Sequence, residues 1–135
     1  MAGSQQRERL IRHIQDVYGI EAEYLWTDIP DCAVFRHPAS RKWFAILMRV
    51  RRDRLGLVGD VPVDIVNVKC GPILVGSLLF EEGFLPSYHM NKSNWITILL
   101  DETIPDTQIV PLLELSYDGV APKRKGRKTK TQKTE

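Results

Sequence analysis

The sequence predicts an α+β domain in which an antiparallel β-sheet carries helices packed on one face. Two observations predict this class. Apolar residues recur at helical spacing near the start of the chain, and strand-like runs with hairpin-length connections follow before helical spacing returns. A length of 135 residues is typical of one domain. We assign residues 1–120 to a single domain, and residues 121–135, which are poor in apolar side chains, to a basic disordered tail.

Local signals bound the individual elements. Ser4 can cap the first helix, and Gly19 can end it. Pro72 suits the first position of a second, well-buried helix, whereas Pro111 predicts a kink or a break in the last one. The expected elements, in order, are helix 4–18, strands 32–36, 43–50 and 63–70, helix 73–80, strands 88–91 and 95–100, and helix 105–117.

The longest predicted strand places alternate side chains on opposite faces of the sheet. Its even-numbered positions are all apolar, so we expect them to pack against the helices. Its odd-numbered positions carry a tryptophan and two arginines, which we expect on the outer face together with polar residues of the next strand. The residues expected on the outer face are Trp43, Arg49, Arg51, Asn67 and Lys69.

The last two strands are expected to form a hairpin. Residues that face each other in an antiparallel pair lie on the same side of the sheet, so apolar residues are matched with apolar residues. The expected pairs are Met90 with Ile96 and Tyr88 with Ile98. This register leaves residues 92–94 as a three-residue loop with Asn94 in the left-handed conformation, and it places His89, Asn91 and Trp95 on the outer face.

Charge is segregated along the chain, although the net charge is only +2. The tail after residue 120 holds seven basic residues against one acidic residue. Inside the domain, residues 36–54 hold seven basic residues against Asp53 alone, while the rest of the domain is acidic. A local basic region in an acidic body favours contact with a polyanion at one place on the surface.

The outer face therefore combines cations, aromatic rings and amides, which is typical of nucleic-acid binding. Arginine and lysine neutralise phosphates, asparagine and histidine add hydrogen bonds, and a tryptophan can stack on a base. The alternative is an ordinary solvated sheet face with Trp43 and Trp95 as cross-strand packing residues. The candidate nucleic-acid-binding residues are Arg49, Arg51, Arg52, Lys69, His89, Asn91, Lys92 and Trp95.

Several motifs of the domain together resemble the MmcQ/YjbR-like DNA-binding proteins. The motifs are VFRHP at 34–38, KWFA at 42–45, VNVKC at 66–70, GFLP at 83–86, YHMNK at 88–92 with Trp95, and LL at 112–113 followed by SY at 116–117. The resemblance implies a CyaY-like (frataxin-like) fold, a bacterial cytoplasmic protein and DNA as the partner. Pro111 and the basic extension after residue 123 depart from the family pattern.

The residues point to no enzyme, cofactor or membrane segment. The three histidines lie at no metal-ligand spacing, Cys32 and Cys70 form no CxxC pair, and no phosphate-binding glycine motif is present. No apolar run approaches the length of a membrane span. Two alternatives to DNA binding remain: a protein-interaction module that uses the same outer face, and a frataxin-like metal- or ligand-binding protein with acidic clusters at 81–82 and 101–102.

Overall fold

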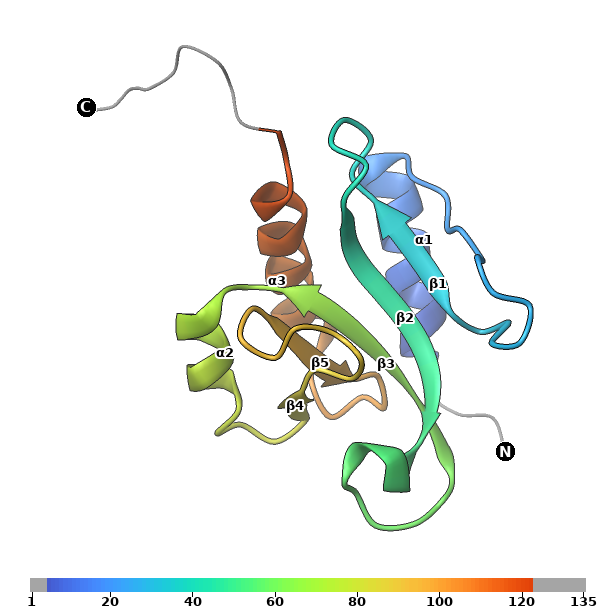
Figure 1. The fold of residues 1–135 in the computed structure, drawn as a ribbon, viewed down its shortest axis with the longest axis vertical. Helices are drawn as coiled ribbons and strands as arrows, with labels where there is room; N and C mark the ends of the chain where they lie inside the picture. Colours follow the sequence, from blue (N-terminus) through green and yellow to red (C-terminus); the bar gives the residue numbers. More distant parts are fainter. Residues whose placement is uncertain (1–4, 123–135) are drawn as a thin grey trace.

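The computed structural model describes residues 5–122 and shows a five-stranded sheet with three helices (Figure 1). All neighbouring strands are antiparallel, in the order β1-β2-β3-β5-β4. Ser4 and the tail beyond residue 122 lie outside the described residues, so the predicted cap and the predicted disorder stay predictions. The elements are α1 (Gln6–Tyr18), β1 (Ala33–Arg36), β2 (Trp43–Arg51), the short 3-10 helix η1 (Arg52–Leu55), β3 (Pro62–Lys69), α2 (Pro72–Leu78), β4 (Phe84–Pro86), β5 (Trp95–Leu99) and α3 (Asp106–Gly119).

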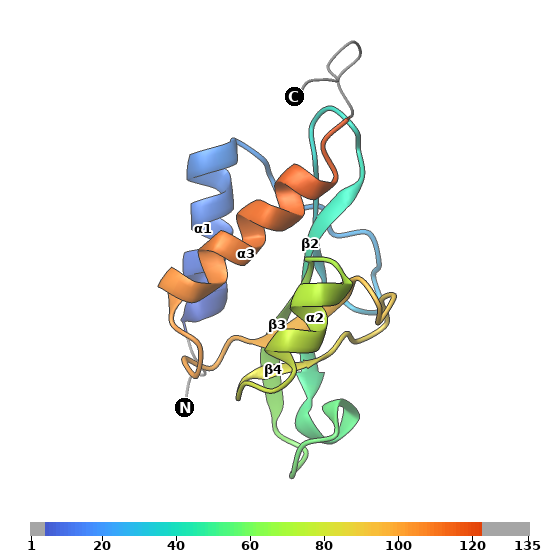
Figure 2. The same ribbon diagram turned by 90° about the vertical axis from the view of Figure 1, so that its left-hand side faces the viewer.

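The helices cover one face of the sheet, which confirms the predicted α+β class. Figure 2 shows α1 and α3 side by side on that face. Buried residues of all three helices, such as Leu10, Val75 and Leu113, join sheet residues such as Leu47 and Ile98 in one apolar cluster, the helix-side core. None of the helices within residues 5–122 is long and apolar enough to cross a membrane.

A β-bulge at the start of β2 changes which of its residues face the helices. Arg36 pairs with Trp43, but the preceding residue, Phe35, pairs with Ala45, so Phe44 is an extra residue in β2. Phe44 and Ala45 both belong to the helix-side core, whereas Trp43 packs on the opposite, open face of the sheet.

The bulge makes the predicted alternation wrong for most of this strand. Ala45 and Leu47 face the helices, and Ile46 and Met48 lie on the open face with Trp43. Arg49 alternates with Leu47 and therefore belongs to the helix-covered side. Adding one residue to a strand exchanges its two faces beyond that point. Strict alternation from Trp43 could not anticipate this exchange.

The predicted late hairpin is also wrong in register and extent. The strand that pairs with β5 is β4, and Pro86 faces Ile96 while Phe84 faces Ile98. Residues 87–94 form a loop instead of a strand and turn. In this loop His89, rather than Asn94, has the left-handed backbone, with φ of 64°.

The two later helices differ from prediction in smaller ways. Helix α3 continues through the exposed Pro111. Of the two predicted alternatives, the break is therefore wrong, and the kink stays a prediction. Helix α2 is less buried than expected, because only Val75 and Leu78 are buried along it. Ile73 is 88% exposed, and Phe80, just beyond the helix, is 93% exposed.

One buried serine joins α3 to the bulge. The Ser116 hydroxyl donates a hydrogen bond of 2.6 Å to the carbonyl of Phe44 and accepts one of 2.9 Å from the backbone amide of Lys69. Ser116 thus satisfies backbone groups of two neighbouring strands beneath the helix. Buried backbone groups without a partner are costly.

We expect Ser116→Ala to lower the free energy of unfolding by about 1–3 kcal/mol, because two backbone groups lose their buried partner. Urea denaturation followed by circular dichroism measures this loss. Ser77→Ala, at an exposed position of α2, is the matched control, since it makes the same change in a helix without breaking a buried bond. A loss no larger than that of the control would contradict the role given to Ser116.

Candidate nucleic-acid interface

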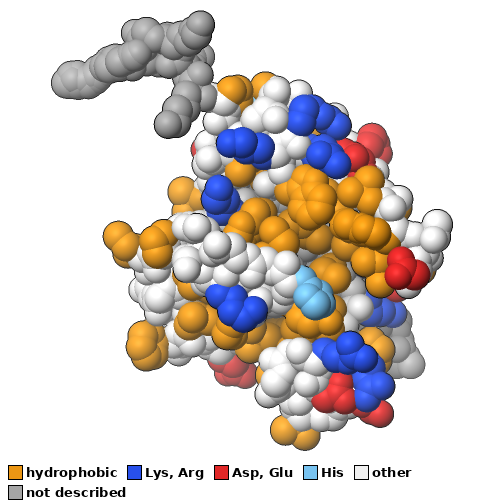
Figure 3. Space-filling model, viewed as in Figure 1, with side chains coloured by type: hydrophobic (Ala, Val, Ile, Leu, Met, Phe, Trp, Pro, Cys, Tyr) orange, Lys and Arg blue, Asp and Glu red, His pale blue; other side chains and the backbone are white. Residues whose placement is uncertain are grey.

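The open face of the sheet is itself apolar. Cys32, Val34, Ile46 and Trp95 form one buried cluster there, and Val50, Val63, Ile65 and Leu99 form a second. Figure 3 shows apolar side chains gathered over the middle of this face, with lysine and arginine side chains around them. Two segments flank this surface, residues 24–31 before β1 and the 87–94 loop before β5.

A hollow of about 260 Å³ lies between these two segments, and we call it the sheet-face hollow. Cys32, just before β1, and side chains from β2 and β3 form its floor, and the two flanking segments supply its walls. Almost all of these side chains are aromatic, aliphatic or sulfur-containing. They are Trp26, Ile29, Cys32, Trp43, Ile46, Met48, Asn67, Tyr88, His89 and Met90.

Aromatic rings stand in pairs around the hollow. Trp26 and Trp43 meet edge to face with ring centroids 5.9 Å apart, and the guanidinium of Arg36 lies 5.8 Å from the centroid of the Trp43 ring. The Tyr88 and His89 rings have centroids 4.0 Å apart. Trp26 is 37% exposed, so part of its ring is free to contact another molecule.

Hydrogen bonds from the sheet hold the 87–94 loop in place. The fully buried Asn67 donates to the Tyr88 carbonyl at 3.1 Å and accepts from the Thr97 hydroxyl. Thr97 in turn accepts the Tyr88 amide at 2.9 Å. Asn67 therefore lies on the open face as predicted, but it works as an anchor for the loop rather than as an exposed reader of bases.

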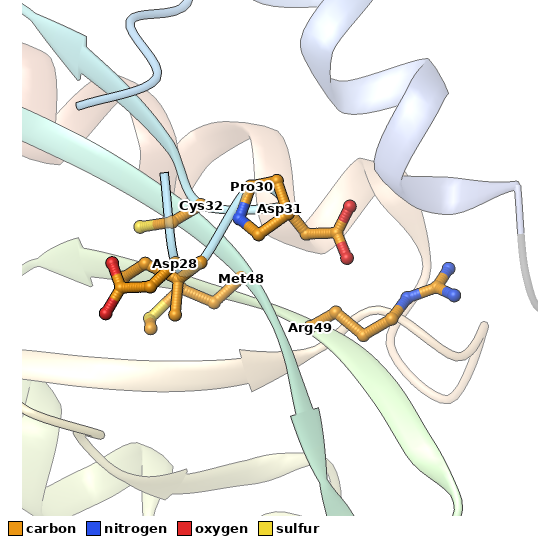
Figure 4. A pocket seen from close by; sticks show the side chains of 7 residues that line it. Asp28, Pro30, Asp31, Cys32, Met48 and Arg49 are labelled. Carbon is orange, nitrogen blue, oxygen red and sulfur yellow. The ribbon is translucent and has the colours of Figure 1, made fainter. Parts of the chain in front are cut away.

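A second hollow of about 340 Å³ continues from the first. It is lined by Ile29, Met48, Arg49, Val50, Arg51, Arg54, Tyr88 and His89. Three of the predicted residues, Arg49, Arg51 and His89, line this hollow. Arg49 and Arg51 nevertheless alternate with Leu47 of the helix-side core, so they reach the rim of the hollow from the other side of β2. A third hollow of about 220 Å³ lies between residues 28–32 and β2. In Figure 4, the Arg49 side chain points away from Met48 and from the thiol of Cys32, whose burial raises its pKa.

All three of the predicted phosphate-binding arginines already have carboxylate partners. Arg49 Nε lies 3.1 Å from Asp64, Arg51 lies 2.7 Å from Asp53, and Arg52 lies 3.9 Å from Asp101. The hydrogen bonds that Arg49 donates to Asp64 and Arg51 donates to Asp53 raise the pKa of both arginines. The bond from Arg51 also lowers the pKa of Asp53. Binding a phosphate here requires exchanging an existing ion pair.

Other cations on this side of the molecule are better placed to receive a phosphate. Within residues 5–122, Lys42, Arg54, Lys69 and Lys92 have no carboxylate within 4.0 Å. Lys42 precedes Trp43, and Lys69 pairs with Trp95 across β3 and β5. Arg54 lines the second hollow. The Lys92 ammonium donates to the Ser87 carbonyl at 2.8 Å and belongs to the 87–94 loop.

Two predicted contact residues have structural roles instead. Trp95 is only 8% exposed and packs in the open-face cluster next to the partly buried Met90, so it is not a stacking platform. The Asn91 side chain accepts the amides of Ser93 and Asn94 and so shapes the turn. His89 and Lys92 remain exposed as predicted.

Sequence reasoning missed Trp26, Ile29 and Tyr88 as walls of the hollow, and Lys42 and Arg54 as free cations. Residues 20–31 carry no regular periodicity, and their only strand-like pairing in the structure is an isolated bridge between Glu23 and Val34. The one available signal was a tryptophan in a segment without predicted secondary structure.

We expect Thr97→Val to release the 87–94 loop, because the isosteric methyl group leaves Asn67 and the Tyr88 amide without their shared partner. The free energy of unfolding should fall by about 1–3 kcal/mol, and hydrogen exchange at Tyr88 should become faster. Thr107→Val, at an exposed position of α3, is the control. Unchanged exchange at Tyr88 would show that the network does not hold the loop.

Known proteins resemble this chain over most of its length. The YjbR family model matches residues 15–119. The uncharacterized protein YyaQ of Bacillus subtilis is 39% identical over 111 residues, which cover 82% of this chain and 94% of YyaQ. The uncharacterized protein YjbR of Escherichia coli is 34% identical over 77 residues, 56% of this chain and 65% of YjbR.

A solved structure agrees with the fold. The crystal structure of a Pseudomonas syringae protein, 39% identical, superposes with a TM-score of 0.83 and covers 85% of this chain and 98% of that protein. These matches confirm the MmcQ/YjbR-like resemblance drawn from the motifs. They do not test the CyaY-like likeness, which stays a prediction.

Proposed function

The chain belongs to the YjbR family, and we propose that it is a non-enzymatic, cytoplasmic DNA-binding protein that holds nucleic acid against the open face of its sheet. One observation carries this proposal. An aromatic, apolar hollow lies on the open face, and Arg54, Lys69 and Lys92 near it have no carboxylate partner among residues 5–122. Aromatic platforms for bases beside cations for phosphates are the combination by which proteins bind nucleic-acid strands.

The cations supply the affinity in this proposal. Each phosphate contact releases bound counterions, so affinity falls steeply as salt rises. Lys42 directly precedes Trp43 at the start of β2, and Lys69 pairs with Trp95 at the end of β3. Neither lysine forms an ion pair with a carboxylate in the described part of the chain. Arg49 and Arg51, bound to acids, contribute less than the sequence suggested.

A protein partner is the second candidate, because four residues of the segment before β1 are exposed and apolar. They are Tyr24, Leu25, Trp26 and Ile29, between 37% and 57% exposed. Exposed apolar patches often mark protein contacts. The free lysines favour a polyanion, since the core of a protein interface is depleted of charged residues, lysine among them.

We expect the double variant Lys42→Ala, Lys69→Ala to weaken DNA binding. The plot of log affinity against log salt should become less steep by about 1.4–1.8, which is 0.7–0.9 for each lost phosphate contact. Fluorescence anisotropy with a labelled oligonucleotide at several salt concentrations measures both quantities. Arg12→Ala is the control. Arg12 is an exposed cation on α1, so its substitution removes the same kind of charge from the helix side.

A second full-length variant separates the folded face from the tail. It carries serine in place of the seven basic residues after position 122. It should keep salt-dependent binding that still responds to the double substitution. If this variant binds nothing, the tail is the only nucleic-acid contact and the proposed interface is wrong.

A further inference from the structure

The geometry points to single-stranded nucleic acid as the ligand, with one unstacked base seated in the sheet-face hollow between Trp26 and the Tyr88–His89 pair. This inference rests on the proposed function and makes it narrower. It follows from the size of the hollow, from the hydrogen bonds that already occupy Asn67 in its floor, and from the cations beside it.

The hollow is sized for a small flat group. Pockets that enclose drug-sized ligands measure roughly 300–1,000 Å³, and this one measures about 260 Å³. The rings of Trp26 and Trp43 both line it. A base in a duplex presents only its edge, because its faces are stacked on its neighbours. A base must be unpaired or displaced to place a face on these rings.

The floor of the hollow offers little with which to tell one base from another. Asn67 is the residue there that could read a base edge, but its side chain is fully buried and is hydrogen-bonded to Tyr88 and Thr97 through both its nitrogen and its oxygen. The remaining floor, Cys32, Ile46 and Met48, is apolar. Stacking is tolerant of base identity because every base has a π face. We therefore expect weak sequence preference.

The surroundings suit the backbone on either side of such a base. Tyr88 and His89 also line the second hollow, so they form a wall common to both. Arg54 lines that second hollow, and no carboxylate of the described residues lies within 4.0 Å of it. Lys42 is exposed and immediately precedes Trp43, which lines the first hollow. A strand that crosses both hollows meets cations on each side of the seated base.

The test uses the full-length protein with three fluorescein-labelled probes of equal length: a single strand, its duplex, and a strand of abasic deoxyribose phosphates. Each is titrated by anisotropy at a fixed salt concentration. We expect the single strand to bind at least tenfold more tightly than the duplex, normalised to the same number of phosphates. The abasic strand should lose most of this advantage, because it keeps the charge and removes the bases.

Trp26→Ala should reduce single-strand affinity by about tenfold, within the range that stacking of one base contributes, and should leave duplex affinity unchanged. Trp26→Phe should restore most of the loss because it restores a ring. Phe80→Ala, which removes a 93% exposed ring at the end of α2 and outside the hollow, should have no effect.

The outcomes separate the two proposals. Equal affinity for the single strand, the duplex and the abasic strand, with no response to Trp26→Ala, overturns the seated base while leaving nucleic-acid binding in place. Binding of none of the three probes overturns the proposed function itself and favours a protein partner for this face. A single-strand preference that depends on bases and on Trp26 supports both proposals.

Discussion

The extra residue in β2 is the constraint on which both faces of the sheet depend. Because Phe44 is inserted opposite the bond between Phe35 and Arg36, it packs against the helices directly before Ala45, and Trp43 is left on the other side. The Ser116 hydroxyl of α3 donates a hydrogen bond to the Phe44 carbonyl, so the helix is bound to β2 at the bulge. Bulges of this kind re-aim side chains next to functional sites.

The candidate site follows from that exchange of faces. Trp43 joins Ile46 and Met48, and together they form an apolar surface where a regular strand would have shown arginines. The two flanking segments then enclose the surface without closing it, and the buried bonds among Asn67, Thr97 and Tyr88 fix one of these walls. Meanwhile, the arginines of β2 come to lie beside acids, Arg49 with Asp64 and Arg51 with Asp53. The free cations and the aromatic surface of the candidate site therefore come from residues other than those that strict alternation along β2 predicts.

Sequence patterns predicted most of the elements, their approximate bounds and the one-sided packing of the helices, because periodicity and turn residues are local signals. They placed the strand that pairs with β5 at 88–91, whereas the structure has it at Phe84–Pro86. They also placed Asn67 and Lys69 on the open face, since β3 is regular. They failed where a single residue changes the register, at Phe44, and where apolar residues belong to two different clusters, as Met90 and Ile96 do. Trp26 could not be placed at all, because its segment is held by tertiary contacts and not by a repeating pattern.

The most direct test of the account is an amide and indole NMR spectrum of the full-length chain, titrated with a short single-stranded oligonucleotide. We predict the largest shifts at the indole groups of Trp26 and Trp43 and at the amides of residues 87–92. We predict small shifts along α1 and at the buried indole of Trp95. Shifts confined to residues beyond 122, or spread over the helix side with the indoles of Trp26 and Trp43 unchanged, would contradict the account.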